Sequence, residues 1–477
     1  MRQKIFYRIF LLYTIIVNVA NAIPLPQNNL QNFSANKQQH LRLSKNMMLH
    51  LSKSPKNPVN TKMTATLVQN DNNTPSSILA VGKLHNQKGD FPLIALSDNN
   101  GNNWSYVLTD KTPKLPSDYL GLDMFTDPTI SCSNQDCVAT MIYQRSGFPA
   151  GRISPLFAIS HDGGHHWSYT LDSQSPQLPK EKSVDISEVS CAQKTCVAVG
   201  STQSSPILMV SQNAGDDWKF IGKDEITSPP KDFSGGFFNS VHCEDSFCIA
   251  AGHYFYDDGD ANNSFPLIAI SSDKGMHWTY NVDFQKSPGI LFTVHCYDQH
   301  CAAGGQSYPA DHHDKALLLT SQDAGMHWNP VEVPRLSDVP DNLEYSILTS
   351  IHCDSNGCMV SGGYFSSNNH DFTFLNGIGD KLDQNWHFST EPIVPASLPD
   401  LDHHNGDQCV AFDSGLNCSG STCVAAGACY LSIEKFTPFV AMSWDKGVSW
   451  QFPVDLNTPA LPDGFSAGRF MASTFVY

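Results

Sequence analysis

Between residues 62 and 477, apolar and polar residues alternate in short runs along the chain. A period of two is typical of β-strands that bury one face. Six pairs of such runs flank a tight turn, and each of these turns is bounded by two cysteines. The pattern predicts six strand–turn–strand hairpins and an all-β fold.

The six cysteine pairs share one spacing, with four residues between the two cysteines. They are Cys132/Cys137, Cys191/Cys196, Cys243/Cys248, Cys296/Cys301, Cys353/Cys358 and Cys418/Cys423. One copy also holds His295 and His300, which are metal-ligand types, but no other copy has both. A zinc site needs three or four fixed ligands, and only the two cysteines recur here. Cysteines that face each other across a hairpin suit a disulfide, so each pair is predicted to form one.

A second motif, Ser-x-Asp-x-Gly-x-x-Trp, recurs in step with the cysteine pairs. Two copies replace the aspartate with asparagine, and a stretched copy ends on Trp386. The motif resembles the Asp-box of the bacterial neuraminidase repeat (BNR repeat) of sialidase-like propellers, in which the box is structural. In such a turn the carboxylate accepts backbone N–H groups, glycine adopts positive φ, and the indole packs on neighbouring strands. The residues assigned this structural role are Asp162, Asp273, Asp323, Asp445, Trp104, Trp167, Trp218, Trp278, Trp328 and Trp450.

The seven closing tryptophans are spaced by 50 to 64 residues, and each unit offers four short strands. A four-stranded antiparallel sheet repeated at this period is typical of a β-propeller blade. We therefore predict a single seven-bladed β-propeller of four-stranded antiparallel blades over residues 62–477, with six or eight blades as the alternatives. The C-terminal segment 469–477 is expected to take part in closing the ring.

In a meandering four-stranded blade, the cysteine turn and the box turn lie on the same side. The opposite side carries the longer and more varied loops, where binding residues are commonly found. Cys409 and Cys429 both fall on that loop-bearing face in the last blade, and they are predicted to form a seventh disulfide, Cys409–Cys429.

The loop-bearing face supplies the candidate ligand-binding residues. They are Arg145, Arg152, Asp257, Asp258, Asp260, Asp311, His312, His313, Asp402, His403 and His404. A sialidase would need three arginines around the substrate carboxylate, and the segment 151–155 is a poor match to the Arg-Ile-Pro stretch of that family. Paired acids could instead serve another glycosidase. No catalytic residue is assigned.

The sequence Asp-His-His-Asp at positions 311–314 is the candidate metal site. Asp311, His312, His313 and Asp314 could together hold a divalent cation, although they match no known cation-binding loop. Acidic, hydrated loops are the plainer interpretation, and no cofactor is expected.

Residues 1–22 combine basic residues, a short apolar run and an Ala-Asn-Ala exit, which predicts a signal peptide. The mature chain is then secreted, or periplasmic in a Gram-negative source, with no transmembrane segment. Residues 23–61 are predicted to form a flexible basic arm. Residues 63–477 carry 20 basic and 46 acidic residues, which disfavours nucleic acid and anionic membranes as partners.

These observations predict an exported, disulfide-stabilised and monomeric binding module. It would recognise an extracellular glycan or protein through its loop-bearing face, because no nucleophile–base motif stands out. The alternative is a sialidase-like glycoside hydrolase or lyase acting on extracellular glycans.

Overall fold

The computed structural model describes residues 77–476, apart from several internal segments. The segments left out are 110–112, 124–125, 147–152, 171–182, 203–204, 223, 228, 231–232, 246, 256–263, 282–287, 310–313, 356, 367–371, 381–384, 391–407, 420–421, 433–434, 445–460, 462–464 and 466. All named elements of the described residues are strands. Among these residues no helix has the length and apolarity that a membrane crossing requires. The predicted signal peptide and basic arm lie outside the described residues.

The strands form seven antiparallel sheets, which we number as blades in chain order. Blade 1 contains β28 (Ala467–Val476), β1 (Ser77–Asn86), β2 (Gly89–Ser97) and β3 (Ser105–Leu108). Blade 2 contains β4 (Tyr119–Leu122), β5 (Thr129–Ser133), β6 (Asp136–Arg145), β7 (Ile153–Ser160) and β8 (Ser168–Thr170). Blade 3 contains β9 (Asp185–Ala192), β10 (Thr195–Thr202), β11 (Ser205–Ser211) and β12 (Lys219–Phe220).

Blades 4 to 7 follow the same order from the innermost strand outward. Blade 4 contains β13 (Gly235–Glu244), β14 (Phe247–Phe255), β15 (Ser264–Ser271) and β16 (Thr279–Asn281), and blade 5 contains β17 (Gly289–Tyr297), β18 (His300–Ser307), β19 (Lys315–Ser321) and β20 (Asn329–Val331). Blade 6 contains β21 (Tyr345–Asp354), β22 (Gly357–Phe365), β23 (Phe372–Asp380) and β24 (Trp386–Ser389). Blade 7 contains β25 (Gln408–Ser419), β26 (Thr422–Ser432) and β27 (Lys435–Ser443).

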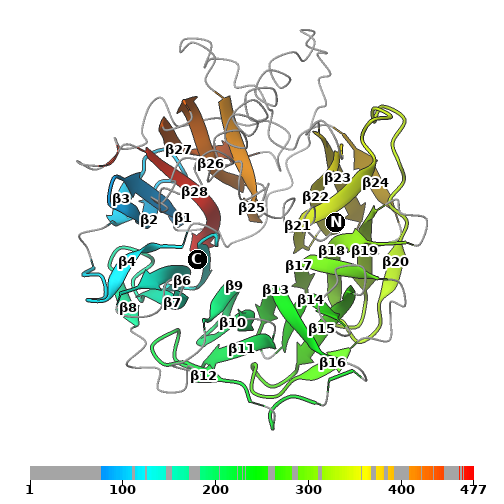
Figure 1. The fold of residues 1–477 in the computed structure, drawn as a ribbon, viewed down its shortest axis with the longest axis horizontal. Coiled ribbons are helices and arrows are strands. Elements are labelled where there is room, and N and C mark those ends of the chain that lie inside the picture. Colours follow the sequence, from blue (N-terminus) through cyan, green and yellow to red (C-terminus); the bar gives the residue numbers. More distant parts are fainter. Residues whose placement is uncertain are drawn as a thin grey trace, which may run out of the picture.

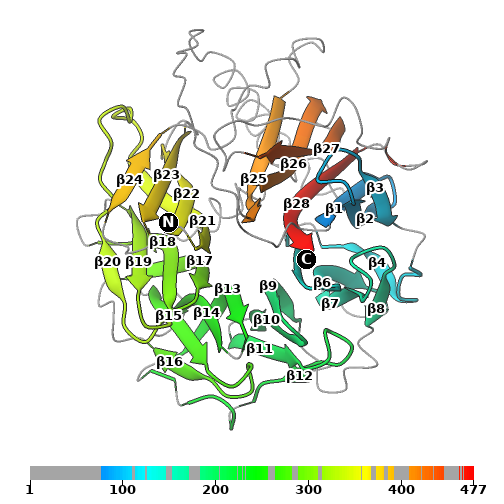
Figure 2. The same cartoon turned by 180° about the vertical axis from the view of Figure 1, so that it is seen from behind.

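The sheets are arranged around a central axis, with the first strand of each blade innermost (Figure 1, Figure 2). Contacts between strands of neighbouring blades link each blade to the next, including blade 7 to blade 1. The C-terminal strand β28 pairs with β1, placing Leu79 opposite Thr474, so the end of the chain supplies the innermost strand of blade 1. The seven-bladed β-propeller predicted from the sequence is therefore the observed fold class. Two blades depart from the four-strand plan: the innermost strand of blade 2 is split into β4 and β5, and blade 7 has three strands among the described residues.

Disulfides close the hairpins at the start of blades 2 to 6. The five described bridges join Cys132–Cys137, Cys191–Cys196, Cys243–Cys248, Cys296–Cys301 and Cys353–Cys358, with Cα–Cα distances of 4.0 to 4.1 Å. In blade 7, Cys423 is disulfide-bonded and lies opposite Cys418 in the backbone register. The same register places Cys409 opposite Cys429. Cys409 thus lies near the start of the innermost strand of blade 7, and the side chains of this pair lie outside the described residues.

The box turns are held by side-chain acceptors within the turn itself. In blade 5, Asp323 Oδ1 accepts the N–H of His327 at 2.8 Å, and Ser321 Oγ accepts the N–H of Gly325 at 2.9 Å. Gly325 has a φ of 81°, a conformation that side-chain-bearing residues rarely adopt. The indole N–H of Trp328 then donates to the Gly325 carbonyl at 2.8 Å. Blades 1 to 4 repeat the serine and Asp/Asn contacts.

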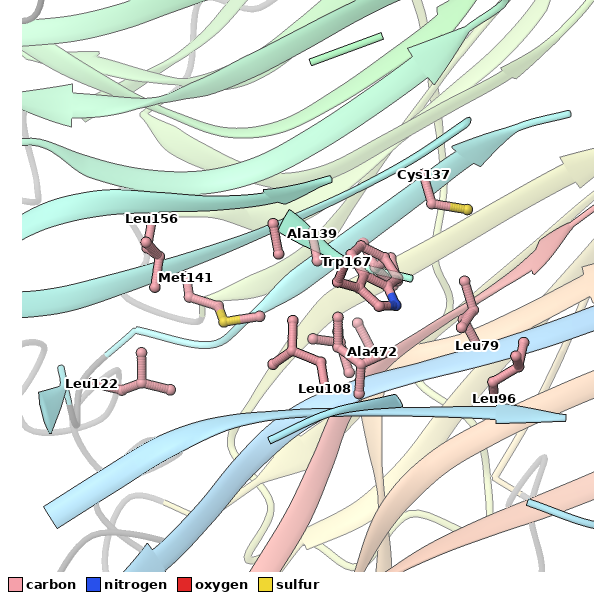
Figure 3. Packing of buried hydrophobic residues seen from close by; sticks show 14 of the residues in the cluster. Leu79, Leu96, Leu108, Leu122, Cys137, Ala139, Met141, Leu156, Trp167 and Ala472 are labelled. Atoms are coloured by element: carbon pink, nitrogen blue, oxygen red, sulfur yellow. The ribbon is translucent and has the colours of Figure 1, made fainter. Parts of the chain in front are cut away.

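Each described box glycine also packs on the preceding blade. A Cβ placed on Gly325 would lie 2.7 Å from Ile249 of blade 4, and one on Gly101 of blade 1 would lie 2.8 Å from Met442 of blade 7. Trp167 of blade 2 belongs to the same buried cluster as Leu79 and Leu108 of blade 1 (Figure 3). The box turns therefore join neighbouring blades as well as closing their own hairpins.

The cysteine turns and box turns lie on one rim. Backbone N–H groups of box residues donate to carbonyls in the cysteine turn of the same blade. These bonds join Gly163 to Gln135, Ala214 to Lys194 and Ala324 to Gln299, at 2.8 to 2.9 Å. The opposite ends of the strands form the loop-bearing face, as the meander requires.

Candidate functional site

Most of the loop residues predicted to bind a ligand lie outside the described residues. This applies to Arg152, Asp257, Asp258, Asp260, Asp311, His312, His313, Asp402, His403 and His404, and also to the box residues Asp445 and Trp450. Their roles stay predictions. Of the predicted ligand-binding and metal residues, only Arg145 and Asp314 can be placed.

Arg145 is the last residue of β6, on the loop-bearing face, and it forms an ion pair within its own blade. Its Nε donates to Asp118 Oδ2 at 2.6 Å, and the neighbouring rings of Tyr119 and Tyr143 stack with centroids 5.7 Å apart. The ion pair bridges the approach to β4 and the end of β6. Arg145 therefore shapes the rim of blade 2, and its charge is already matched by a carboxylate.

Asp314 precedes β19 in the loop-bearing part of blade 5. Its backbone carbonyl accepts the N–H of Ser346 in blade 6 at 3.2 Å. Burial, followed by the charge of Asp314, raises the pKa values of Tyr308 and Tyr345, the latter to about 12. Among the described residues, no group of three or more His, Cys, Asp or Glu side chains is placed to hold a metal ion. The cation site at 311–314 stays a prediction, because its other residues are not described.

A different set of charged residues gathers where the inner strands of blades 1 to 3 reach the loop-bearing face. We call this set the channel mouth, and it consists of Lys83, Asp123, Asp127, Asp185 and Arg469. Asp185 begins β9, Arg469 is near the start of β28, Lys83 is near the end of β1, and Asp123 and Asp127 lie between β4 and β5. Their charges interact with one another across three blades.

Lys83 is buried and ties blade 1 to the interruption in blade 2. Its ammonium donates to the backbone carbonyls of Asp123 at 2.7 Å and Thr126 at 2.5 Å. Burial, followed by the charge of Arg469, lowers the pKa of Lys83 to about 8. Arg469 lies directly opposite Lys83 in the pairing of β1 with β28. The two cations are thus held side by side by the sheet, and the neighbouring acids offset their repulsion.

Asp185 differs from the other acids of the channel mouth. Its side chain is partly buried, and no described residue is hydrogen-bonded to its carboxylate. Burial, followed by the negative charge of Asp123, raises the pKa of Asp185 to about 6, and the charge of Lys83 opposes this shift. A carboxylate in this state can accept hydrogen bonds from a ligand when ionised, or donate a proton when protonated.

The interruption between β4 and β5 adds two further oxygen atoms to the channel mouth. Thr126 Oγ1 and Asp127 Oδ1 are both buried and have no hydrogen-bond partner among the described residues. Asp123 has a weak contact, at 3.4 Å, from the Nε2 of Gln144. At the outer edge, His85 Nδ1 lies 2.7 Å from Asp90 Oδ1. Two acceptor oxygens without a partner among the described residues, Thr126 Oγ1 and Asp127 Oδ1, therefore lie close to the hydrogen-bonded Lys83 ammonium.

The channel mouth was not predicted from the sequence. Lys83 stands in the apolar run of 78–84, and a lysine in a strand with both faces buried was the one local signal of an unusual environment. Asp123 and Asp185 carry no such signal, because a single acid between apolar residues also fits a strand with one face exposed to solvent. Only the arrangement of blades brings these residues together.

Comparisons with known proteins add little to this geometry. No protein-family model and no curated protein sequence matches the chain. Among solved structures it is similar to a GH74 enzyme of Niastella koreensis, at 12% identity over 81% of this chain and 68% of that chain, with a TM-score of 0.41. It is also similar to a Trypanosoma rangeli sialidase in complex with the inhibitor DANA, at 12% identity over 67% of this chain and 55% of that chain, with a TM-score of 0.38. Similarities this weak carry no argument about activity.

Proposed function

We propose that this chain is an exported glycan-binding propeller of the BNR/Asp-box, sialidase-like type, which takes its ligand at the channel mouth. The observation that carries the proposal is the state of Asp185. It is a partly buried carboxylate at the start of an innermost strand, on the loop-bearing face, and no described residue is hydrogen-bonded to it. A carboxylate that keeps some access to solvent can accept hydrogen bonds from the hydroxyl groups of a ligand.

The division between the two rims supports this location. Disulfide and box turns occupy one rim, where short hydrogen-bonded turns leave their side chains committed to the scaffold. The opposite rim holds the longer connections and the channel mouth. Rigid strands that carry polar groups at their ends are suited to orienting a hydroxyl-rich ligand.

The disulfides support export, because bridges of this kind persist in oxidising compartments. An extracellular glycan is accordingly the ligand class that we propose, in preference to a protein partner. The channel mouth offers buried acceptors for hydroxyl groups, whereas protein interfaces are dominated by aromatic and other large anchors.

A glycan array with the purified chain tests the binding proposal. The matched variants are Asp185→Asn and Asp298→Asn; Asp298 is an exposed residue of the blade 5 cysteine turn on the opposite rim. Binding that is retained by Asp298→Asn and reduced about tenfold or more by Asp185→Asn supports the channel mouth as the site. Binding of no glycan, or equal binding by both variants, contradicts the proposal.

Glycoside hydrolysis is the second candidate, and the coupling of Asp185 to Asp123 favours it. A carboxyl with a pKa of about 6 can donate a proton to the leaving glycosidic oxygen, while a second carboxylate accepts one from water. Incubating each array ligand with the chain and separating the products tests this. Cleavage that is lost in Asp185→Asn makes the chain a hydrolase, whereas binding with intact ligand makes it a binding module only.

A further inference from the structure

A hydrogen bond that recurs at the cysteine-turn rim ties the inner strands of neighbouring blades together. The side chain before the first cysteine of one blade accepts the backbone N–H of the first cysteine in the next blade. Ser131 Oγ accepts from Cys191 at 2.9 Å, and Ser190 Oγ accepts from Cys243 at 2.9 Å. These bonds join blade 2 to blade 3 and blade 3 to blade 4. We call each of them a rim latch.

The seam between blades 5 and 6 has the same bond with a different acceptor. His295 stands at the position of the two serines, and its Nδ1 accepts the N–H of Cys353 at 3.2 Å. A hydroxyl oxygen keeps its acceptor lone pairs throughout the physiological pH range. An imidazole nitrogen that gains a proton becomes a donor and can no longer accept. The rim latch of blades 5 and 6 therefore depends on pH, whereas the serine latches do not.

The surroundings of His295 do not stabilise a proton on its ring. The rings of His242 on β13 and His352 on β21 have centroids 3.9 Å and 4.7 Å from that of His295. Burial, followed by these two neighbours, lowers the pKa of His295 well below its usual value. Protonation would also leave the buried N–H of Cys353 facing a second donor, and moving the two strands apart lets water hydrate both groups.

The nearby carboxylates are not positioned to pair with this ring. Glu244 Oε1 is 3.9 Å from His242 Nε2, which is buried and has no hydrogen-bond partner among the described residues. The other oxygen of Glu244 accepts the N–H of Asp298 at 2.9 Å. The titratable groups on the elements packed around His295 at this rim are His242 and Glu244 on β13, Asp298 after β17, His300 on β18, and His352 and Asp354 on β21.

The loop-bearing end of the same seam is held by groups that do not titrate. Ser346 Oγ accepts the N–H of Ala316 at 2.9 Å, and the N–H of Ser346 donates to the carbonyl of Asp314 at 3.2 Å. Between the two ends, Leu318 of blade 5 and Leu348 of blade 6 belong to one buried cluster. Loss of the rim latch therefore frees one end of the seam while the other end stays tied.

We propose that blades 5 and 6 form an acid-operated seam, in which protonation of His295 releases the N–H of Cys353 and opens the cysteine-turn end of the seam. The serine-latched seams stay closed, so the response is local and reversible. Such openings occur at a lower free energy than global unfolding. The seam is closed at neutral pH and opens as the pH falls below the unfolded histidine value of about 6.5. This response is independent of any ligand at the channel mouth.

Hydrogen exchange of the full chain, read by mass spectrometry of peptic fragments, tests the proposal. The fragment with Cys353 reports the histidine latch, and the fragment with Cys243 reports a serine latch. Measured rates are corrected for the pH dependence of intrinsic exchange. As the pH falls from about 7.5 to about 5, protection of the Cys353 fragment should fall by up to about tenfold per pH unit, and protection of the Cys243 fragment should stay constant.

Two variants assign the response to the latches. His295→Asn keeps an acceptor oxygen at this position but removes the titrating group, so protection of the Cys353 fragment should no longer depend on pH. Ser190→Ala removes a serine latch, and it should lower protection of the Cys243 fragment by the same factor at every pH.

Three results would overturn the proposal. The first is protection at Cys353 that does not change with pH. The second is an equal fall at Cys243, because that indicates global unfolding. The third is an unchanged pH dependence in His295→Asn, because another group then controls the seam. If His295→Asn does not fold, the comparison of the two wild-type fragments decides by itself.

Discussion

The imidazole of His161 in blade 2 lies between the carboxylates of Asp136 and Asp216. Its Nδ1 is 2.6 Å from Asp136 Oδ1, and its Nε2 is 3.1 Å from Asp216 Oδ1 in the box turn of blade 3. A neutral imidazole has a single N–H, so only the protonated ring donates to both acids. The hydrogen bond to Asp136 is the main cause of the raised pKa of His161.

The His161 bridge should make the seam between blades 2 and 3 weaken as the pH rises. A raised folded-state pKa means that the stabilisation is fully present below the unfolded value of about 6.5 and is lost as the pH passes the folded value. His161 is 48% exposed, so solvent screening limits the effect to about 1 kcal/mol or less.

Urea unfolding at about pH 5.5 and about pH 8 measures this loss of stability, and the wild type should lose more stability between the two pH values than His161→Gln. His165→Gln, whose ring is 3.6 Å from Asp98, is the control. A difference between wild type and His161→Gln that is the same at both pH values would falsify the bridge.

Acid should destabilise the chain through His295, whose ring lies between the rings of two other histidines on the inner strands of blades 4 to 6. The rings of His242 and His295 have centroids 3.9 Å apart, and those of His295 and His352 are 4.7 Å apart. Burial, followed by the two neighbouring histidines, lowers the pKa of His295 well below its usual value. The neutral ring also accepts the N–H of Cys353 at Nδ1, at 3.2 Å.

The depressed pKa of His295 fixes the direction of this effect. The stabilisation is present above the unfolded value of about 6.5 and is lost as the pH falls toward the folded value, by up to about 1.4 kcal/mol per pH unit. His295→Asn places the residue that blade 7 has at position 417, and it should reduce the acid slope of the free energy of unfolding. Denaturant titrations at several pH values check this, with the exposed His387→Asn as the control. An unchanged acid slope in His295→Asn would show that the ring gains its proton without cost.

Substituting Gly325 should loosen the contact between blades 4 and 5. Gly325→Ala forces a side chain into a φ of 81° and places its Cβ 2.7 Å from Ile249 Cδ1. We expect a loss of about 2 to 4 kcal/mol in the free energy of unfolding, from backbone strain and overpacking together. The neighbouring Ala324 also has a positive φ, so Ala324→Gly should be neutral or slightly stabilising. Equal stability of Gly325→Ala and the wild type would mean that the turn can move away from blade 4.

Cys409 and Cys429 should be joined in the mature protein, because the pairing of β25 with β26 places them directly opposite each other. Peptide mapping by mass spectrometry without reduction should recover the two cysteines in one linked species. The double variant Cys409→Ser/Cys429→Ser should lose about 3 kcal/mol of stability, since the bridge closes a longer loop than the hairpin disulfides do. Two alkylated, free thiols in the unreduced protein would contradict the pairing.

The features that could be predicted from the sequence are those whose causes are local. A cysteine pair four residues apart and the Ser-x-Asp-x-Gly-x-x-Trp turn form most of their contacts within a few residues, as the bonds from Asp323 to His327 and from Ser321 to Gly325 show. Repetition of such units at a constant period then predicts a ring of blades. The split of the blade 2 inner strand was not predictable, because the segment 123–128 has no repeat partner to mark it as an insertion.

The sequence by itself determined the hairpins, their disulfides, the box turns and the fold class, because backbone hydrogen bonding and turn chemistry depend on neighbouring residues. Only the tertiary structure decided that Lys83, Asp123, Asp185 and Arg469 share the channel mouth, and that His161 bridges two blades. Burial and Coulomb interactions depend on distance in space, and residues 40 to 386 positions apart in the chain approach only when the blades pack around a common axis.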